Sequence, residues 1–180
     1  MILSSLKEKK GLTLIELVIA LAIFSVVLAA SYTFYFYVYR SITIASQQSE
    51  LQFNVRMASD RIRDIVHFAN EMEVLQYSEE AAGQDEAIYA DSSALIHHKS
   101  GAAANLLGYN YGNIAFQISF NKKDDVFLWY NVRGTKGGQT FEISREIQIL
   151  SIPEDEEIIK SFGDPSTTGE AIVFHFPPAP

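Results

Sequence analysis

Glu16 is the residue whose placement most clearly carries chemistry, because it is the only charged side chain between Leu12 and Tyr39. A charged side chain at the centre of a bilayer costs about 2.5–3.5 kcal/mol, and less near the interface. Two arrangements would offset this cost. Thr13 and Glu16 have the spacing of a capping box, in which each side chain bonds the other's backbone N–H. Alternatively, proteolysis after Gly11 would free an ammonium group on Leu12, close enough along a helix to attract the carboxylate.

The other polar clusters favour structural roles. His97 and His98 are adjacent, so in a strand they face opposite sides instead of converging on a metal. The acidic run at residues 154–157 lacks the ligand spacing of a calcium loop, and residues 124–125 have the composition of a turn. The segment 134–138 lacks the spacing of a phosphate-binding loop. We therefore expect no catalytic residues, no metal site and no cofactor in a chain that is not an enzyme.

The composition describes an apolar N-terminal segment followed by a water-soluble domain. The chain has 180 residues, of which 48% are hydrophobic and 20% charged, and most of its charged residues follow residue 39. The net charge of −8 opposes contact with phosphate, so we expect no direct binding of nucleic acid. The absence of cysteine excludes disulfides, cysteine-ligated zinc and thiol catalysis.

The apolar segment predicts a single membrane crossing. Residues 17–39 carry no charge, and as a helix they extend about 35 Å, enough for a hydrocarbon core of about 30 Å. The lysines within residues 1–11 place the N-terminus in the cytoplasm by the positive-inside rule. Aromatic residues crowd positions 32–39 and precede Arg40, which predicts an interfacial belt at the outer membrane surface. The domain would then lie outside.

Two alternatives compete for this segment. Aromatic residues favour strands, but the run is far too long for one strand. A secretory signal peptide is the stronger rival, because Leu28-Ala29-Ala30-Ser31 offers small residues at which signal peptidase cleaves. The apolar core of a signal peptide usually spans about 7–15 residues, which is shorter than the run seen here.

The leader and the start of the apolar run resemble those of type IV prepilins and of type II secretion pseudopilins. The resemblance is carried by Lys9-Lys10-Gly11-Leu12-Thr13-Leu14-Ile15-Glu16-Leu17 and the apolar residues that follow. It implies cleavage between Gly11 and Leu12 by a prepilin peptidase, N-methylation of Leu12, and assembly of the apolar helices into a filament core. It also implies that Glu16 pairs with the N-terminal amine of a neighbouring subunit. The expected partners are other pilin or pseudopilin subunits, the peptidase and the membrane.

Two departures from the family pattern stand out: the first concerns the start of the mature chain, and the second weakens the case for the main filament subunit. Leu12 stands where the mature chain most often begins with phenylalanine, and Ser25 and Thr33 stand where major pilins often carry a helix-loosening glycine and proline. Residues 56–65 also resemble the second half of this helix in larger minor pilins and J-type pseudopilins. The resemblance therefore implies a larger minor subunit of the J or W type.

We expect an α+β, pilin-like fold. Its parts would be a prepilin leader at 1–11, a transmembrane and filament-core helix at 12–39, an amphipathic continuation at 40–72 and a β-rich head at 73–180. The continuation carries apolar residues at spacings of three and four, which predict a helix face packed on the head's own sheet, with a coiled coil as the alternative. These residues are Ile44, Leu51, Val55, Ala58, Ile62, Ile65, Ala69 and Met72.

The head reads as strands and turns on one antiparallel sheet, with a variable excursion at 76–108. Strands are predicted at 114–120, 126–132, 140–150 and 171–176, with a hairpin across the first two, a short hairpin at 87–98 and turns at 134–138 and 162–165.

Three functions are compatible with this organisation. The leading hypothesis is a structural minor pilin or pseudopilin of a type IV pilus or a related secretion or competence filament. Such a protein would sit in the cytoplasmic membrane before assembly and on the cell surface afterwards. The alternatives are a tip-displayed subunit that binds a surface or ligand, and an extracellular domain that stays anchored in the membrane.

Overall fold

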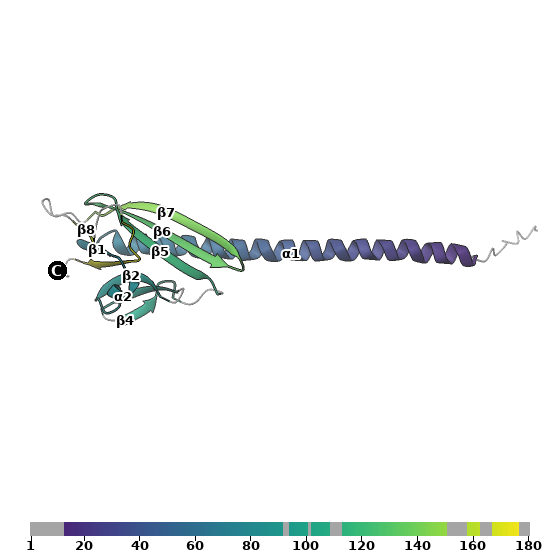
Figure 1. The fold of residues 1–180 in the computed structure, drawn as a ribbon, viewed down its shortest axis with the longest axis horizontal. Coiled ribbons are helices and arrows are strands. Elements are labelled where there is room, and N and C mark those ends of the chain that lie inside the picture. The colour runs from purple at the N-terminus through teal and green to yellow at the C-terminus, as the bar shows by residue number, and fades with distance from the viewer. Residues whose placement is uncertain are drawn as a thin grey trace, which may run out of the picture. The chain divides into compact units, whose positions relative to one another are not determined.

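A computed structural model describes residues 13–91, 94–100, 102–108, 113–150, 158–162 and 167–176. The chain forms two compact units, an N-terminal unit (Met1–Ala45) and a second unit (Ser46–Pro180) that we call the head. Helix α1 (Leu14–Val66) contributes residues to both units (Figure 1). The expected α+β fold, a long N-terminal helix followed by a β-rich head, is confirmed.

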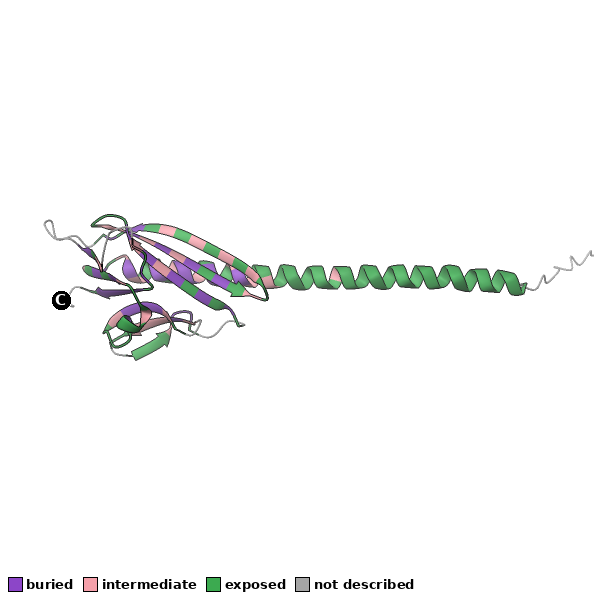
Figure 2. Cartoon of the chain, in the orientation of Figure 1, coloured by how far each residue is buried: buried purple, intermediate pink, exposed green. Residues whose placement is uncertain are grey.

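In the head, α1 supplies one wall of the hydrophobic core. The side chains that face the strands are fully buried and recur at spacings of three and four, namely Leu51, Val55, Ala58, Ile62 and Val66. The prediction that this face packs on the head's own strands is confirmed. Figure 2 shows the buried stripe on the helix within the head. Ile44, which was predicted to belong to the stripe, is 41% exposed.

The predicted end of the helix at residue 72 is wrong. The helix ends at Val66, and the chain turns before it enters strand β1 (Glu71–Leu75). Ala69 and Met72 are nevertheless buried. In β1 every second residue faces the core, and Met72 is one of these residues. Its burial therefore follows from the strand, and its agreement with the helical spacing is a coincidence.

The strands form two sheets, so the prediction of one antiparallel sheet is wrong. Sheet A has the order β4-β3-β2-β9-β1-β8. In this sheet β9 lies between β1 and β2 and is antiparallel to both, whereas β8 is parallel to β1. Besides β1, its strands are β2 (Glu86–Asp91), β3 (Ala94–Lys99), β4 (Ala102–Asn105), β8 (Ile159–Ser161) and β9 (Ala171–His175).

The segment 76–108 is therefore part of a sheet. The hairpin predicted at 87–98 is confirmed as β2 and β3, and its neighbours β9 and β4 tie it into sheet A. The short helix α2 (Ser78–Ala81) adds Ala81 to a second, smaller apolar cluster with Tyr89 and Val173. Strands β1, β4 and β8, which have five, four and three residues, were not predicted.

Sheet B has the order β5-β6-β7, formed by β5 (Ala115–Lys122), β6 (Phe127–Lys136) and β7 (Gln139–Gln148). The predicted hairpin across its first two strands is confirmed. The turn predicted at 134–138 is shorter, because strand β6 continues to Lys136. Gly137 and Gly138 have φ values of 56° and 79°, as a two-residue type I′ hairpin turn requires. Most of the turn predicted at 162–165 lies outside the described residues.

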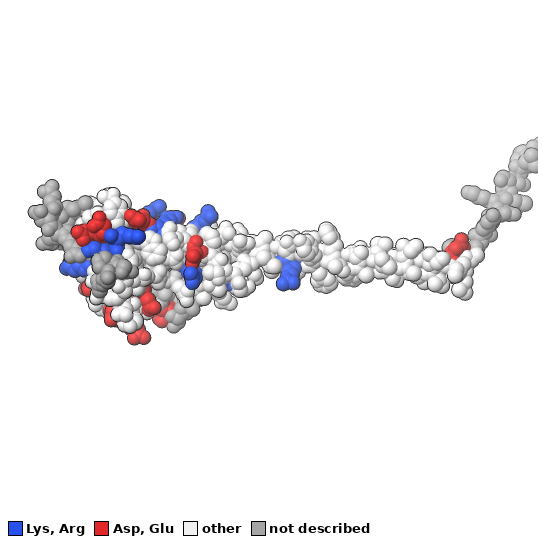
Figure 3. Space-filling model, turned by 45° about the horizontal axis from the view of Figure 1, so that its top comes forward, with Lys and Arg blue, Asp and Glu red and all other residues white. Residues whose placement is uncertain are grey.

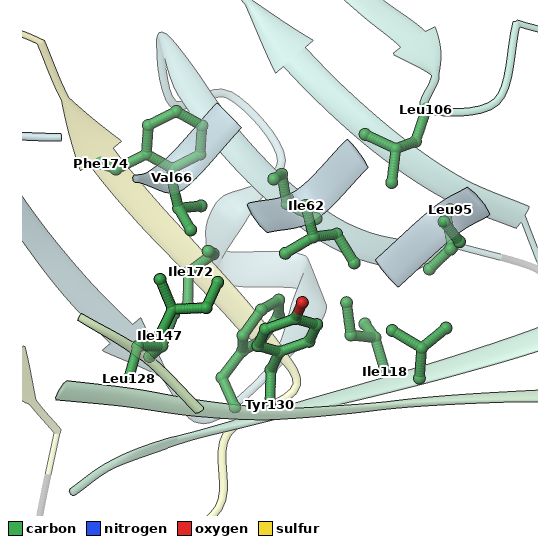
Figure 4. Close-up of a cluster of buried hydrophobic side chains, with 14 of the residues drawn as sticks. Ile62, Val66, Leu95, Leu106, Ile118, Leu128, Tyr130, Ile147, Ile172 and Phe174 are labelled. Carbon is green, nitrogen blue, oxygen red and sulfur yellow. The ribbon is translucent and has the colours of Figure 1, made fainter. Parts of the chain in front are cut away.

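The main core joins α1 to both sheets. Figure 4 shows Ile62 and Val66 of the helix facing Tyr130 and Ile118 of sheet B, with Phe174 of sheet A beside them. The Tyr130 hydroxyl lies 3.1 Å from the Ser59 hydroxyl and donates a 2.9 Å hydrogen bond to the Ser59 carbonyl. This polar contact fixes how the helix is rotated and shifted against sheet B.

Candidate functional site

The first turn of α1 contains the predicted capping box. The Thr13 backbone N–H and hydroxyl each donate a 2.8 Å hydrogen bond to Glu16 Oε2. In return, the Glu16 backbone N–H donates a 3.3 Å hydrogen bond to the Thr13 hydroxyl. These bonds satisfy donors that a helix N-terminus otherwise leaves without partners. The capping-box interpretation is therefore confirmed.

The capping box leaves part of the Glu16 carboxylate available. Both Thr13 donors reach Oε2, and Oε1 has no hydrogen bond to any residue that the structure describes. The residue itself is exposed. An additional donor can therefore approach Oε1 without displacing Thr13. Gly11 and Leu12, which would provide the cleavage site and the free amine, lie outside the described residues.

The helix that follows Glu16 is apolar on every side and is not covered within its own unit. Large hydrophobic side chains from Leu14 to Leu28 are 42–81% exposed. Figure 3 shows few charged side chains over the N-terminal unit and many on the head. In the described part of the chain, α1 is the one helix long and apolar enough to cross a membrane. A helix that is apolar all round fits a lipid or helix-packed environment.

Hydroxyl groups do not interrupt this surface. Ser25, Ser31 and Thr33 each donate a hydrogen bond of 2.8–2.9 Å to the carbonyl four residues earlier. A bonded hydroxyl has a lower cost in an apolar environment than a free one. The helix is continuous through Ser25 and Thr33, the positions at which major pilins often carry a glycine and a proline.

An aromatic cluster follows near the end of the N-terminal unit. Tyr35 stacks on Tyr39 at 6.4 Å between ring centroids, and Tyr32 stacks on Phe36 at 6.5 Å. These pairs are four residues apart, so each lies along one side of the helix. All four rings are 61–63% exposed. Their position before Arg40 agrees with an interfacial aromatic belt.

The two histidines of the head are held apart, as their adjacency predicted. His97 Nε2 lies 3.3 Å from Glu86 Oε2, and its ring stacks on Phe174 at 6.1 Å. His98 Nδ1 instead lies 2.8 Å from the Gln84 carbonyl oxygen. Among the described residues no group of three or more histidine or acidic side chains is placed to hold a metal ion. The acidic run 154–157 lies outside them.

The predicted turn between β5 and β6 is also confirmed. The Asp125 N–H donates a 2.8 Å hydrogen bond to the Asp124 side chain, and Lys122 pairs with Asp125 at 2.8 Å. These acidic residues therefore shape the turn.

Sequence analysis missed the buried polar residues of α1. Ser59 and Asn54 are 0% and 1% exposed. Ser59 continues the spacing of Leu51 and Val55, so the helical period could have placed it on the buried face. Its hydroxyl partner on β6 is 71 residues away, and no local pattern predicts a contact at that separation.

Known proteins resemble this chain in two respects, the N-terminal segment and the fold. The family described as "Prokaryotic N-terminal methylation motif" matches residues 6–32. No curated protein matches the sequence. Two solved structures have a similar fold, both of the PilB minor pilin from Streptococcus sanguinis.

One is an aspartate-to-alanine mutant, with a TM-score of 0.58 and 13% identity. The other has a TM-score of 0.54 and 11% identity. Each similarity covers 73% of this chain and 35% of the other, so this chain spans about a third of the PilB structures. Residues 6–32 therefore match the N-terminal methylation motif, and the fold of the chain is similar to that of the PilB minor pilin.

Proposed function

We propose that this protein is a structural minor pilin or pseudopilin subunit that assembles into a type IV pilus or a related secretion or competence filament. One observation carries the proposal. The Glu16 carboxylate is held by Thr13 at the start of a continuous apolar helix whose surface is exposed in its own unit. The methylation motif across residues 6–32 supports the same function. The subunit acts by packing and not by catalysis.

Processing prepares the subunit for assembly. A prepilin peptidase cleaves between Gly11 and Leu12, and Leu12 is then N-methylated. The basic leader, residues 1–11, keeps the N-terminus in the cytoplasm. Residues 12–39 cross the membrane and later enter the filament core, while the β-rich head, residues 73–180, stays outside. Residues 40–66 connect the two as the amphipathic half of α1.

Glu16 sets the axial position of an incoming subunit. Thr13 occupies Oε2, which lowers the cost of keeping the carboxylate charged in the membrane. Oε1 is then available to the N-terminal amine of a neighbouring subunit. In the apolar filament core an ammonium and a carboxylate attract strongly, whereas an unpaired charge is costly. The pair therefore favours one register between adjacent helices.

A set of three variants separates the charge of Glu16 from its capping role. Glu16→Gln keeps an oxygen that can accept the Thr13 bonds but loses the charge, and Glu16→Ala loses both. Thr13→Val is the matched control, because it keeps the charge and removes the capping hydroxyl at a cost of about 1 kcal/mol. We expect both Glu16 variants to be processed and inserted yet nearly absent from sheared filaments, with Thr13→Val still incorporated. The measurement is the amount of processed protein in filaments relative to membranes.

The opposite pattern, with Thr13→Val absent and Glu16→Gln incorporated, would assign Glu16 to capping alone. Normal recovery of all three variants would leave the carboxylate without a role in assembly.

N-terminal sequencing of the mature protein tests the processing step. The chain is expected to begin at Leu12, and Gly11→Val is expected to block cleavage because its branched side chain obstructs close approach of the peptidase. A mature chain that begins at Ser31 would support an ordinary signal peptide and contradict the filament proposal.

A further inference from the structure

A groove of about 590 Å³ lies on the head between β5 and β6 of sheet B, Ala90 of β2 and the segment that leads into β9 of sheet A. Its volume falls in the range of about 300–1,000 Å³ that is usual for ligand sites. Most of the side chains around it are polar. The part of the lining used below consists of Phe116, Ile118, Arg133, Gly169 and Glu170.

Strand β5 contributes one wall of this groove. Phe116 and Ile118 line the groove, although their side chains belong to the core and each residue is only 6% exposed. Phe120 exchanges two 2.8 Å backbone hydrogen bonds with Gly169, on the side of β5 away from β6. Backbone groups alternate in direction along an antiparallel strand. Ile118 and Phe116 therefore present their N–H and C=O groups on the same edge as Phe120.

This edge is open because the neighbouring segment leaves it. Gly169 pairs with Phe120, but Ala171 already belongs to β9 and pairs with strands of sheet A. In the described part of the chain no strand continues the pairing along Phe116 and Ile118. Each of these residues thus offers one donor and one acceptor to the groove.

The charges around the groove favour a basic ligand. Arg133 already pairs with Glu142, at 2.8 Å through Nε and 2.7 Å through Nη2. Glu170 is exposed, and among the described residues its carboxylate has no ion pair. The lining therefore has one uncompensated negative charge.

We propose that this groove binds an extended segment of a partner polypeptide that carries basic side chains. The segment adds to sheet B as a strand antiparallel to β5, in line with the residues that pair with Phe120. Its backbone exchanges hydrogen bonds with Phe116 and Ile118, and a lysine or arginine lies beside Glu170. Main-chain pairing at an open strand edge provides affinity, and alternate side chains provide selectivity. The inference concerns the head alone and does not depend on filament assembly.

A synthetic peptide tests the proposal on the full chain in detergent micelles. The probe is acetyl-Lys-Val-Lys-Val-Lys-amide, and hydrogen exchange of individual backbone amides is followed by NMR. We expect the peptide to slow exchange at Phe116 and Ile118 in proportion to its occupancy. Alternate backbone amides of the bound peptide point towards β5, so either the valine or the lysine amides form the hydrogen bonds. One peptide is N-methylated on the valines and another on the lysines, and the form in which these amides are blocked is expected to bind about tenfold more weakly.

Glu170→Lys tests the charge, and Glu146→Lys is the matched control because it makes the same change on β7, which does not line the groove. The first variant is expected to weaken binding of the lysine peptide about fivefold, and the second to leave it nearly unchanged. Absence of binding at millimolar peptide would overturn the proposal. Binding that leaves exchange at Phe116 and Ile118 unchanged, or that responds equally to both variants, would also overturn it.

Discussion

Gly134→Ala is the substitution for which the contact between helix and sheet makes the clearest prediction. Gly134 lies on β6, and its Cα faces α1. A Cβ added here would lie 2.6 Å from Val55 Cγ2, 2.9 Å from Leu51 Cδ1 and 3.3 Å from Ile114 Cγ2. Two of these distances are shorter than carbon atoms tolerate, and both helix residues are fully buried. The methyl group must therefore displace the helix or the side chains.

Overpacking of this kind costs about 1–3 kcal/mol. Alanine also reduces the conformational entropy of the unfolded chain, which stabilises the folded state by about 0.4–1 kcal/mol. We expect a net loss of about 1–2 kcal/mol in the free energy of unfolding. For a unit of this size each kcal/mol lowers the melting temperature by roughly 4 °C.

Urea denaturation of the full chain in detergent micelles measures this loss. The chain has one tryptophan, Trp129 on β6, whose fluorescence reports on the sheet. Thr135→Ala is the matched control, because Thr135 is the next residue on the strand and is exposed. Val55→Ala removes the methyl group that the new Cβ would touch, so the double variant is expected to lose at least 1 kcal/mol less than the sum of the two single losses. Unchanged stability of Gly134→Ala, or simple additivity in the double variant, would refute the steric argument.

Three further perturbations test other parts of the head. Gly169→Ala places a Cβ 2.2 Å from the Leu75 carbonyl oxygen; backbone cannot yield as a side chain can, so denaturation should show a larger loss than for the β6 glycine. Tyr130→Phe removes the hydrogen bonds to Ser59 and should cost about 1–2 kcal/mol in the same assay, with little further loss when Ser59→Ala is added. Burial holds the pKa of His97 below its usual value. As the pH falls from about 6.5, His97 is therefore protonated in the unfolded chain before it is protonated in the folded one. The free energy of unfolding decreases over this range, until the pH reaches the lower pKa of the folded state. His97→Phe should show a shallower loss of stability between pH 7 and 5, and an unchanged slope would refute this assignment.

The sequence was sufficient where one local pattern determined the structure. The spacing of Thr13 and Glu16 predicted the capping box, and the apolar spacing from Leu51 to Ile62 predicted the buried helix face. Strands β5, β6 and β9 were long or apolar enough to be found.

The split into two sheets could not be predicted in this way. It depends on pairings such as that of Met72 with both Ile159 and Phe174. The sequence of a short strand does not indicate which distant strands it pairs with. The open edge at Ile118 has the same origin, because it exists only where the chain leaves one sheet for the other. The Glu16 carboxylate is different: its local geometry followed from sequence, whereas the partner that we propose for it would belong to another subunit.

The place of β9 in sheet A has a consequence for the order in which the head can form. Among the strands that the structure describes this one comes last in sequence, yet it lies between β1 and β2 and joins them. β2 can pair with β3, and β1 with β8, before β9 has been made, but β1 and β2 cannot be joined in one sheet until residues 171–175 are present. Contacts so distant in sequence fold slowly, and unpaired apolar strands are prone to aggregation. Loss of β9 would thus leave β1 and β2 without the strand that joins them, so completion of sheet A depends on residues 171–175.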